Sequence, residues 1–183
     1  MLLHIAIQEP RMLLAIVQGT PHWVWALLGA LLWLGASQML PRRTSLRHAL
    51  LSPLAITVFS AWGLISAFDR THAATALGTW AGTSLVVARV SLAVHRGAPA
   101  GTRFDPRALR FHLPGSTAPL LLILAIFFTK YIVGVELALR PELAGNGSFA
   151  LDVALIYGLF NGLLLARVAR LWRIARPRSV ATA

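Results

Sequence analysis

Cysteine is absent from this chain of 183 residues, and acidic residues are scarce, with 6 Asp and Glu against 17 Lys and Arg. Without thiols the chain forms no disulfide, no thiolate metal site and no iron–sulfur cluster. Charged residues of both signs make up 13% of the sequence and hydrophobic residues 57%, and the mean hydropathy is +0.69. A soluble domain of this length carries more charge, so the composition predicts a membrane protein.

The formal net charge of +11 raises the question of a nucleic-acid partner. Nucleic-acid binders gather basic and aromatic residues on a soluble face. Here the arginines fall between apolar runs, which is the pattern of membrane topology. We therefore expect the lipid bilayer, and no nucleic acid, as the main partner.

Five apolar runs have about the 20 residues that a helix needs to cross a bilayer. They cover residues 22–40, 46–68, 71–94, 117–139 and 149–171. The predicted fold class is an all-α membrane protein, a bundle of about five transmembrane helices with a short cytoplasmic loop or β-hairpin. Residues 1–21 are predicted to be an external segment, residues 22–171 the transmembrane domain and residues 172–183 a basic cytoplasmic tail. The first 21 residues lack the features of a signal peptide, and Met12 is an alternative start.

Arginines alternate between the segments that separate these runs. One set of segments is rich in them: Arg42 and Arg43; Arg96, Arg103, Arg107 and Arg110; Arg173, Arg176 and Arg178. The other set holds Arg11, Arg70 and Arg140. Basic loops stay in the cytoplasm, so the pattern predicts a multi-pass protein of a bacterial inner membrane with its N-terminus outside and its C-terminus inside.

The longest soluble segment spans residues 96–116. Phe111 and Leu113 alternate there with Arg110 and His112, which favours a short β-hairpin. An irregular basic loop is the other interpretation.

Lys130 is the ionisable residue that lies deepest in a predicted span, about nine residues or 14 Å from its outer end. Tyr157 and Asn161, one turn apart on the fifth run, lie at nearly the same depth. These three residues are the candidate polar intramembrane site. They either bind an ion, a proton or a small anion, or form hydrogen bonds that fix helix packing, and the second interpretation is favoured.

Glycines at helical spacing are the second feature of the spans. Gly78 and Gly82 in the third run, Gly134 in the fourth, and Gly158 and Gly162 in the fifth are predicted to let helices approach closely. The same faces suit a homodimer or a membrane-protein partner, and the sequence does not choose between these occupants.

The remaining polar residues have structural interpretations. Glu136 and Arg140 are spaced for a local ion pair, and Ser148 is the predicted N-cap one turn before Asp152. Histidine spacings typical of metal sites are absent, although His22 and His72 both lie near the outer face. We expect no metal, no cofactor and no catalytic residue, so the protein is predicted not to be an enzyme.

Two motifs carry a family resemblance, Thr20-Pro21-His22-Trp23-Val24-Trp25 and Phe127-Phe128-Thr129-Lys130-Tyr131. Together with the segment around Tyr157, they resemble an uncharacterised family of small bacterial multi-span proteins, common in proteobacteria, that has no assigned activity. The resemblance implies a start near Thr20, which favours Met12. A fainter likeness links the chain to membrane accessory proteins of cytochrome c maturation. The expected function is that of an accessory or assembly protein; the alternative is a small transporter or channel with a polar site at Lys130.

Overall fold

The computed structural model describes residues 16–95, 97, 101–105, 108 and 110–175. Most of the predicted external segment, the alternative start at Met12 and the last eight residues of the predicted tail lie outside this range. The elements in chain order are α3 (His22–Ser37), β1 (Arg42–Ser45), α4 (Leu46–Ala67), α5 (Arg70–Val94), β2 (Arg103–Asp105), β3 (Arg110–Leu113), α6 (Ala118–Leu139), the short 3₁₀ helix η1 (Pro141–Gly145) and α7 (Gly147–Ala175). A helix therefore occupies each of the predicted apolar runs.

Among the residues that the structure describes, three helices are long and apolar enough to cross a membrane: α5 with 25 residues, α6 with 22 and α7 with 29. Helix α3 has 16 residues, which span about 24 Å and fall short of the roughly 30 Å hydrocarbon core. The described apolar stretch of α4 is Pro53–Ala67, and the helix itself begins at Leu46 and runs through Pro53. Membrane crossing by α3 and α4 therefore stays a prediction.

The chain divides into two compact units, residues 1–39 with 116–141 and residues 40–115 with 142–183. The first unit contains α3 and α6. Gly35 of α3 lies against Leu120 of α6, where a Cβ atom would come within 3.2 Å of the Leu120 Cα. Nearby, the Ser116 backbone N–H donates to the carbonyl of Gln38 at 3.2 Å. These contacts fix the end of α3 against the start of α6.

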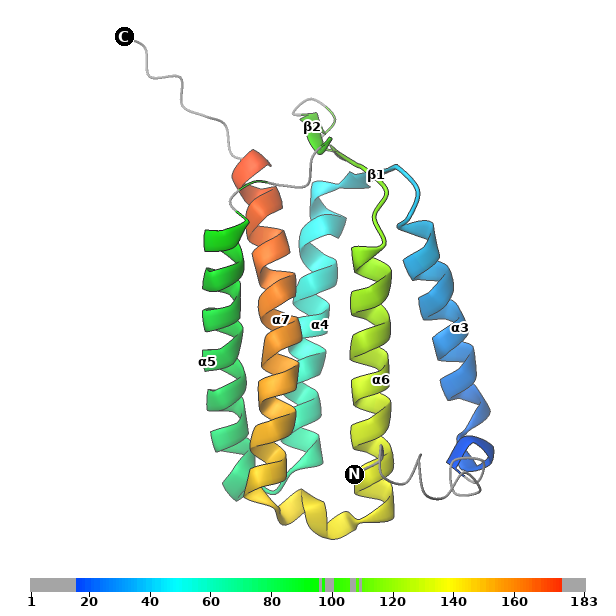
Figure 1. The fold of residues 1–183 in the computed structure, drawn as a ribbon, viewed down its shortest axis with the longest axis vertical. Coiled ribbons are helices and arrows are strands. Elements are labelled where there is room, and N and C mark those ends of the chain that lie inside the picture. The colour runs from blue at the N-terminus through cyan, green and yellow to red at the C-terminus, as the bar shows by residue number, and fades with distance from the viewer. Residues whose placement is uncertain (1–15, 96, 98–100, 106–107, 109, 176–183) are drawn as a thin grey trace. The chain divides into compact units, whose positions relative to one another are not determined.

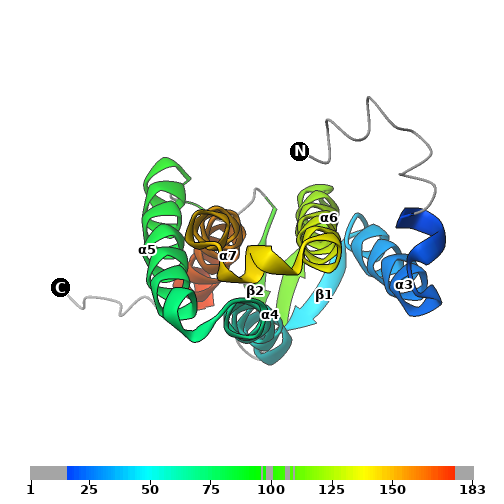
Figure 2. The same cartoon turned by 90° about the horizontal axis from the view of Figure 1, so that it is seen from below.

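The second unit contains α4, α5, α7 and the three strands. Helix α7 packs on both α4 and α5, as the view along the helices shows (Figure 2). Its buried residues run through most of its length, from Ala150 to Leu171. Helix α7 is therefore the core element of this unit.

A three-stranded antiparallel sheet in the order β1-β3-β2 belongs to the same unit (Figure 1). The predicted hairpin is confirmed, because β2 pairs with β3. Phe111 and Leu113 are buried and pack against Leu171 at the end of α7, whereas Arg110 is exposed. Strand β1 was not predicted, since Arg42-Arg43-Thr44-Ser45 has no apolar alternation and its partner lies far away in the chain.

The residue that caps the start of α7 differs from the predicted one. The backbone N–H of Phe149 donates to the Oδ1 of Asn146 at 3.0 Å, so Asn146 caps the helix and Ser148 does not. Asparagine competes well for this position because its side-chain oxygen reaches the free amides of the first turn.

Candidate functional site

The predicted polar site divides between the two units. Lys130 lies on α6 in the first unit, whereas Tyr157 and Asn161 lie on α7 in the second. Because these residues belong to different units, the grouping of Lys130 with the other two residues stays a prediction. The surroundings of each residue within its own unit show what it can do.

Asn161 is the centre of a polar network that links three helices. Its side chain is 3% exposed. The Thr57 hydroxyl on α4 donates to Asn161 Oδ1 at 2.7 Å, and Asn161 Nδ2 donates to the Ser84 hydroxyl on α5 at 3.1 Å. One amide on α7 therefore connects to both neighbouring helices.

The network closes on backbone groups at both ends. The Ser84 hydroxyl accepts from Asn161 and donates its own proton to the carbonyl of Trp80 at 2.7 Å. The Thr57 hydroxyl also lies 3.0 Å from the carbonyl of Pro53, a second acceptor on its own helix. A Thr hydroxyl carries one proton, so the Thr57 proton is shared between two acceptors, Asn161 Oδ1 and the Pro53 carbonyl. Polar side chains that bond to one another and to backbone carbonyls are typical of a packing contact in an apolar medium.

Gly158 and Gly162 border Asn161 and lie directly against the backbone of α5. A Cβ on Gly158 would lie 2.9 Å from the carbonyl oxygen of Trp80, and one on Gly162 would lie 2.6 Å from that of Ser84. Only glycine fits this approach, because the obstacles are backbone atoms of α5. Tyr157, which is also buried, stands next to this contact in the chain.

The other predicted packing glycines do not take part in such contacts. Nothing lies within 4 Å of a Cβ placed on Gly78, Gly82 or Gly134. Their predicted packing role therefore stays a prediction. Helix α5 meets α7 through Trp80, Thr83 and Ser84, a face that does not include Gly78 or Gly82.

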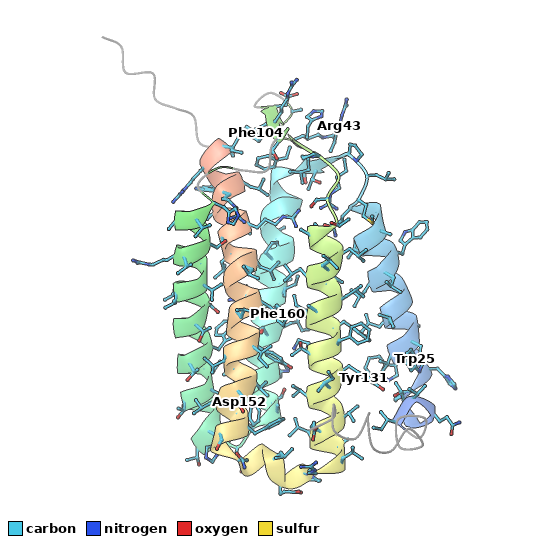
Figure 3. The ribbon with its side chains drawn as sticks, in the orientation of Figure 1. Trp25, Arg43, Phe104, Tyr131, Asp152 and Phe160 are labelled. Carbon is cyan, nitrogen blue, oxygen red and sulfur yellow. The ribbon has the colours of Figure 1, made fainter. Side chains whose placement is uncertain are left out.

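In the first unit, a hydrogen bond near Lys130 was not predicted from the sequence. The hydroxyls of Tyr131 on α6 and Thr20 before α3 are 2.6 Å apart. Thr20 donates its proton to the carbonyl of Ile16 at 2.7 Å, so Tyr131 donates to Thr20. Figure 3 labels Tyr131 on α6. Lys130 itself is half-buried, and the adjacent residue is the one that ties α6 to the segment before α3.

The predicted ion pair is present at the end of α6, where Arg140 Nη2 lies 3.9 Å from Glu136 Oε2.

Among the residues that the structure describes, His, Asp and Glu side chains do not gather in groups of three or more that would hold a metal ion. Side-chain hydrogen bonds between elements are made by the amide and hydroxyls around Asn161 and by the Thr20–Tyr131 pair. Thr57 and Ser84 were missed because isolated hydroxyl residues are common in apolar helices.

Comparison with known proteins gives a single kind of match. A protein-family model described as a family of unknown function matches residues 1–182. Since the match begins at residue 1, residues 1–11 fall within the family pattern, unlike the start near Thr20 that the resemblance implied. No curated protein and no solved structure matches.

Proposed function

Because the chain belongs to the DUF6622 family of unknown function, no relative supplies an activity, and we propose that it is a membrane-embedded accessory or assembly protein and not an enzyme. One observation carries this proposal. Asn161, the most buried polar side chain described within the helices that bear the predicted site, uses both its oxygen and its nitrogen to join α4, α5 and α7. The side-chain hydrogen bonds of Asn161 therefore hold these helices together.

A second candidate is a small transporter or channel centred on Lys130. The half-buried position of this lysine on α6 favours it, because an intramembrane cation often marks a pathway for ions. Asn161, its predicted neighbour, is already engaged with Thr57 and Ser84 within the second unit. We therefore place this candidate behind the accessory role.

We further propose that all five apolar helices cross a bacterial inner membrane, with the N-terminus outside and the C-terminus in the cytoplasm. The charges of the second unit support this orientation. Its sheet end includes Arg43 and Phe104, and Asp152 lies towards the other end (Figure 3). The described basic residues of the sheet end are Arg42, Arg43, Arg89, Arg103, Arg110, Arg167, Arg170 and Arg173, with Asp105 as the acidic one.

The opposite end of the same unit is acidic. There the Asp69 backbone N–H donates to the carbonyl of Ala144 at 3.3 Å, which joins the α4–α5 turn to the segment before α7. Asp69, Glu142 and Asp152 accompany Arg70 in this region. Arginine-rich ends stay in the cytoplasm, so the sheet end is expected to face inward.

Reporter fusions test this topology. A reporter fused after Arg70 is expected to be active outside the inner membrane, and one fused after Arg178 inside it, because the sheet end holds most of the arginines. Alkaline phosphatase and green fluorescent protein give opposite signals in the two compartments. The reverse pair of signals would contradict the orientation, and equal signals at both positions would contradict an odd number of crossings between them.

Site-specific photo-crosslinking in cells tests the accessory role. Helix α3 buries only Gly35 among its residues, and Trp33 on it is 81% exposed. A photoreactive phenylalanine at Trp33 is expected to yield one defined protein adduct, because a partner helix would cover this face. The matched control is Phe59 on α4, 71% exposed, where lipid adducts are expected. Lipid adducts at both positions would count against a partner on α3.

A further inference from the structure

Three arginines of the second unit meet where the sheet joins α7. Arg167 and Arg170 are spaced one turn apart near the end of α7, so they share a face of the helix. Arg42, the first residue of β1, and Arg170 both lie close enough for their positive charges to act on Arg167. All three side chains are half-buried. We call these residues the arginine cluster.

The pairing of the strands explains how Arg42 reaches this cluster. Arg42 lies opposite Leu113 of β3, and Leu113 packs against Leu171 of α7. Residues paired across strands share a face of the sheet, so Arg42 belongs to the face that covers α7. Arg43 and Arg103 both pair with His112 and therefore form a second basic row on the opposite face.

Two of the three charges, those of Arg167 and Arg170, have no acidic partner among the described residues. Arg170 donates to the backbone carbonyl of Ser91 at 3.4 Å and to its hydroxyl at 3.3 Å, and both acceptors are neutral. Arg167 makes no hydrogen bond or ion pair with the part of the chain that the structure describes. Asp105, the described acidic residue at this end, lies opposite Arg110 in the strand register, on the other face of the sheet. Burial also lowers the pKa of Arg42 from its usual value.

Half-buried like charges are costly unless an anion joins them. A guanidinium presents a planar fork of N–H donors that fits a phosphate group in a bidentate manner. Trp172, which follows this cluster on α7 and is exposed, is the type of residue that lies at headgroup level. Basic sites between transmembrane helices at the cytoplasmic side suit anionic lipid headgroups.

We propose that Arg42, Arg167 and Arg170 bind the phosphate group of an anionic phospholipid such as cardiolipin or phosphatidylglycerol. Arg167 supplies the guanidinium that is not used within the described chain, and Arg42 and Arg170 flank it. The lipid phosphate brings a negative charge to Arg167 and Arg170, which have no acidic partner among the described residues. The inference does not depend on the accessory role, and either can fail alone.

Native mass spectrometry of the purified full chain in detergent tests the site with cardiolipin, phosphatidylglycerol and zwitterionic phosphatidylcholine as probes. Arg167→Gln is expected to weaken cardiolipin binding about ten-fold, since a charge-assisted pair is lost. Arg43→Gln removes the same charge from the exposed face of the sheet and is the matched control, with an expected change of less than about two-fold. Phosphatidylcholine is expected to bind weakly to all variants.

Several outcomes would overturn the proposal. Equal losses in Arg167→Gln and Arg43→Gln would indicate general charge attraction, and equal affinity for phosphatidylcholine would indicate that no anion is recognised. Displacement of cardiolipin by free inorganic phosphate would assign the cluster to a soluble anion. If Arg167→Gln does not yield folded protein, Arg167→Lys carries the comparison, because it keeps the charge and loses the fork; unchanged cardiolipin affinity in that variant contradicts the site.

Discussion

Replacing Gly162 by leucine is expected to destabilise the protein by about 3 kcal/mol or more, because the new side chain would collide with the backbone of α5. A Cβ at this position already lies 2.6 Å from the carbonyl oxygen of Ser84. A backbone carbonyl cannot rotate away as a flexible side chain can, so α5 and α7 would have to separate. Their separation would also break the hydrogen bond from Asn161 to Ser84. Unfolding of the purified protein in mixed micelles, followed by tryptophan fluorescence, measures the loss.

Gly82→Leu is the matched control for this change. It introduces the same side chain into another glycine of a Gly-x-x-x-Gly pair, but there nothing lies within 4 Å of the new Cβ. The expected change in unfolding free energy is within about 0.5 kcal/mol, as for a surface substitution. Similar losses in both variants would show that leucine is harmful in these helices regardless of α5–α7 contact. A loss of oligomer only in Gly82→Leu would assign Gly78 and Gly82 to a homodimer.

The sequence predicted the helices well because bilayer-length apolar runs are a strong local signal. Observed helices begin and end near the predicted limits, and the alternation around Phe111 correctly predicted one hairpin. Strand β1 was missed because it pairs with β3, a segment about seventy residues away in the chain. Its own four residues are polar and show no alternation that would predict a strand. The 16 residues of α3 are few for a span, so its crossing of the membrane stays a prediction.

The candidate site was predictable only in part. Asn161, Gly158 and Gly162 were found because polar and small residues are rare enough in an apolar helix to stand out. Their partners Thr57 and Ser84 were not found, since the rotation of each helix about its axis decides which hydroxyl faces the amide. The same rotation turns Gly78 and Gly82 away from α7. Helix rotation is set by tertiary packing, which one sequence without a structure does not reveal.

Asn161→Asp is expected to destabilise the protein by about 3 kcal/mol, the scale of cost for a carboxylate in the middle of a membrane. The substitution keeps the shape of the side chain and replaces the Nδ2 donor by a second oxygen. The hydroxyls of Thr57 and Ser84 can still donate to the carboxylate, but neither supplies a positive charge. Asn161→Leu removes both interhelical bonds without adding charge and is expected to cost only about 1 kcal/mol, because Thr57 and Ser84 also reach carbonyl acceptors on their own helices.

The difference in stability between these two variants shows whether the polar network around Asn161 is dry or hydrated. If unfolding in mixed micelles shows the aspartate to be clearly worse than leucine, the site is dry and the amide serves to hold α4, α5 and α7 together, in keeping with an accessory protein. If the two variants are equally stable, water reaches the carboxylate through the second unit. A hydrated polar group at this depth would contradict the structural role and favour transport. Membrane helices accommodate a charged side chain where it faces a water-filled path.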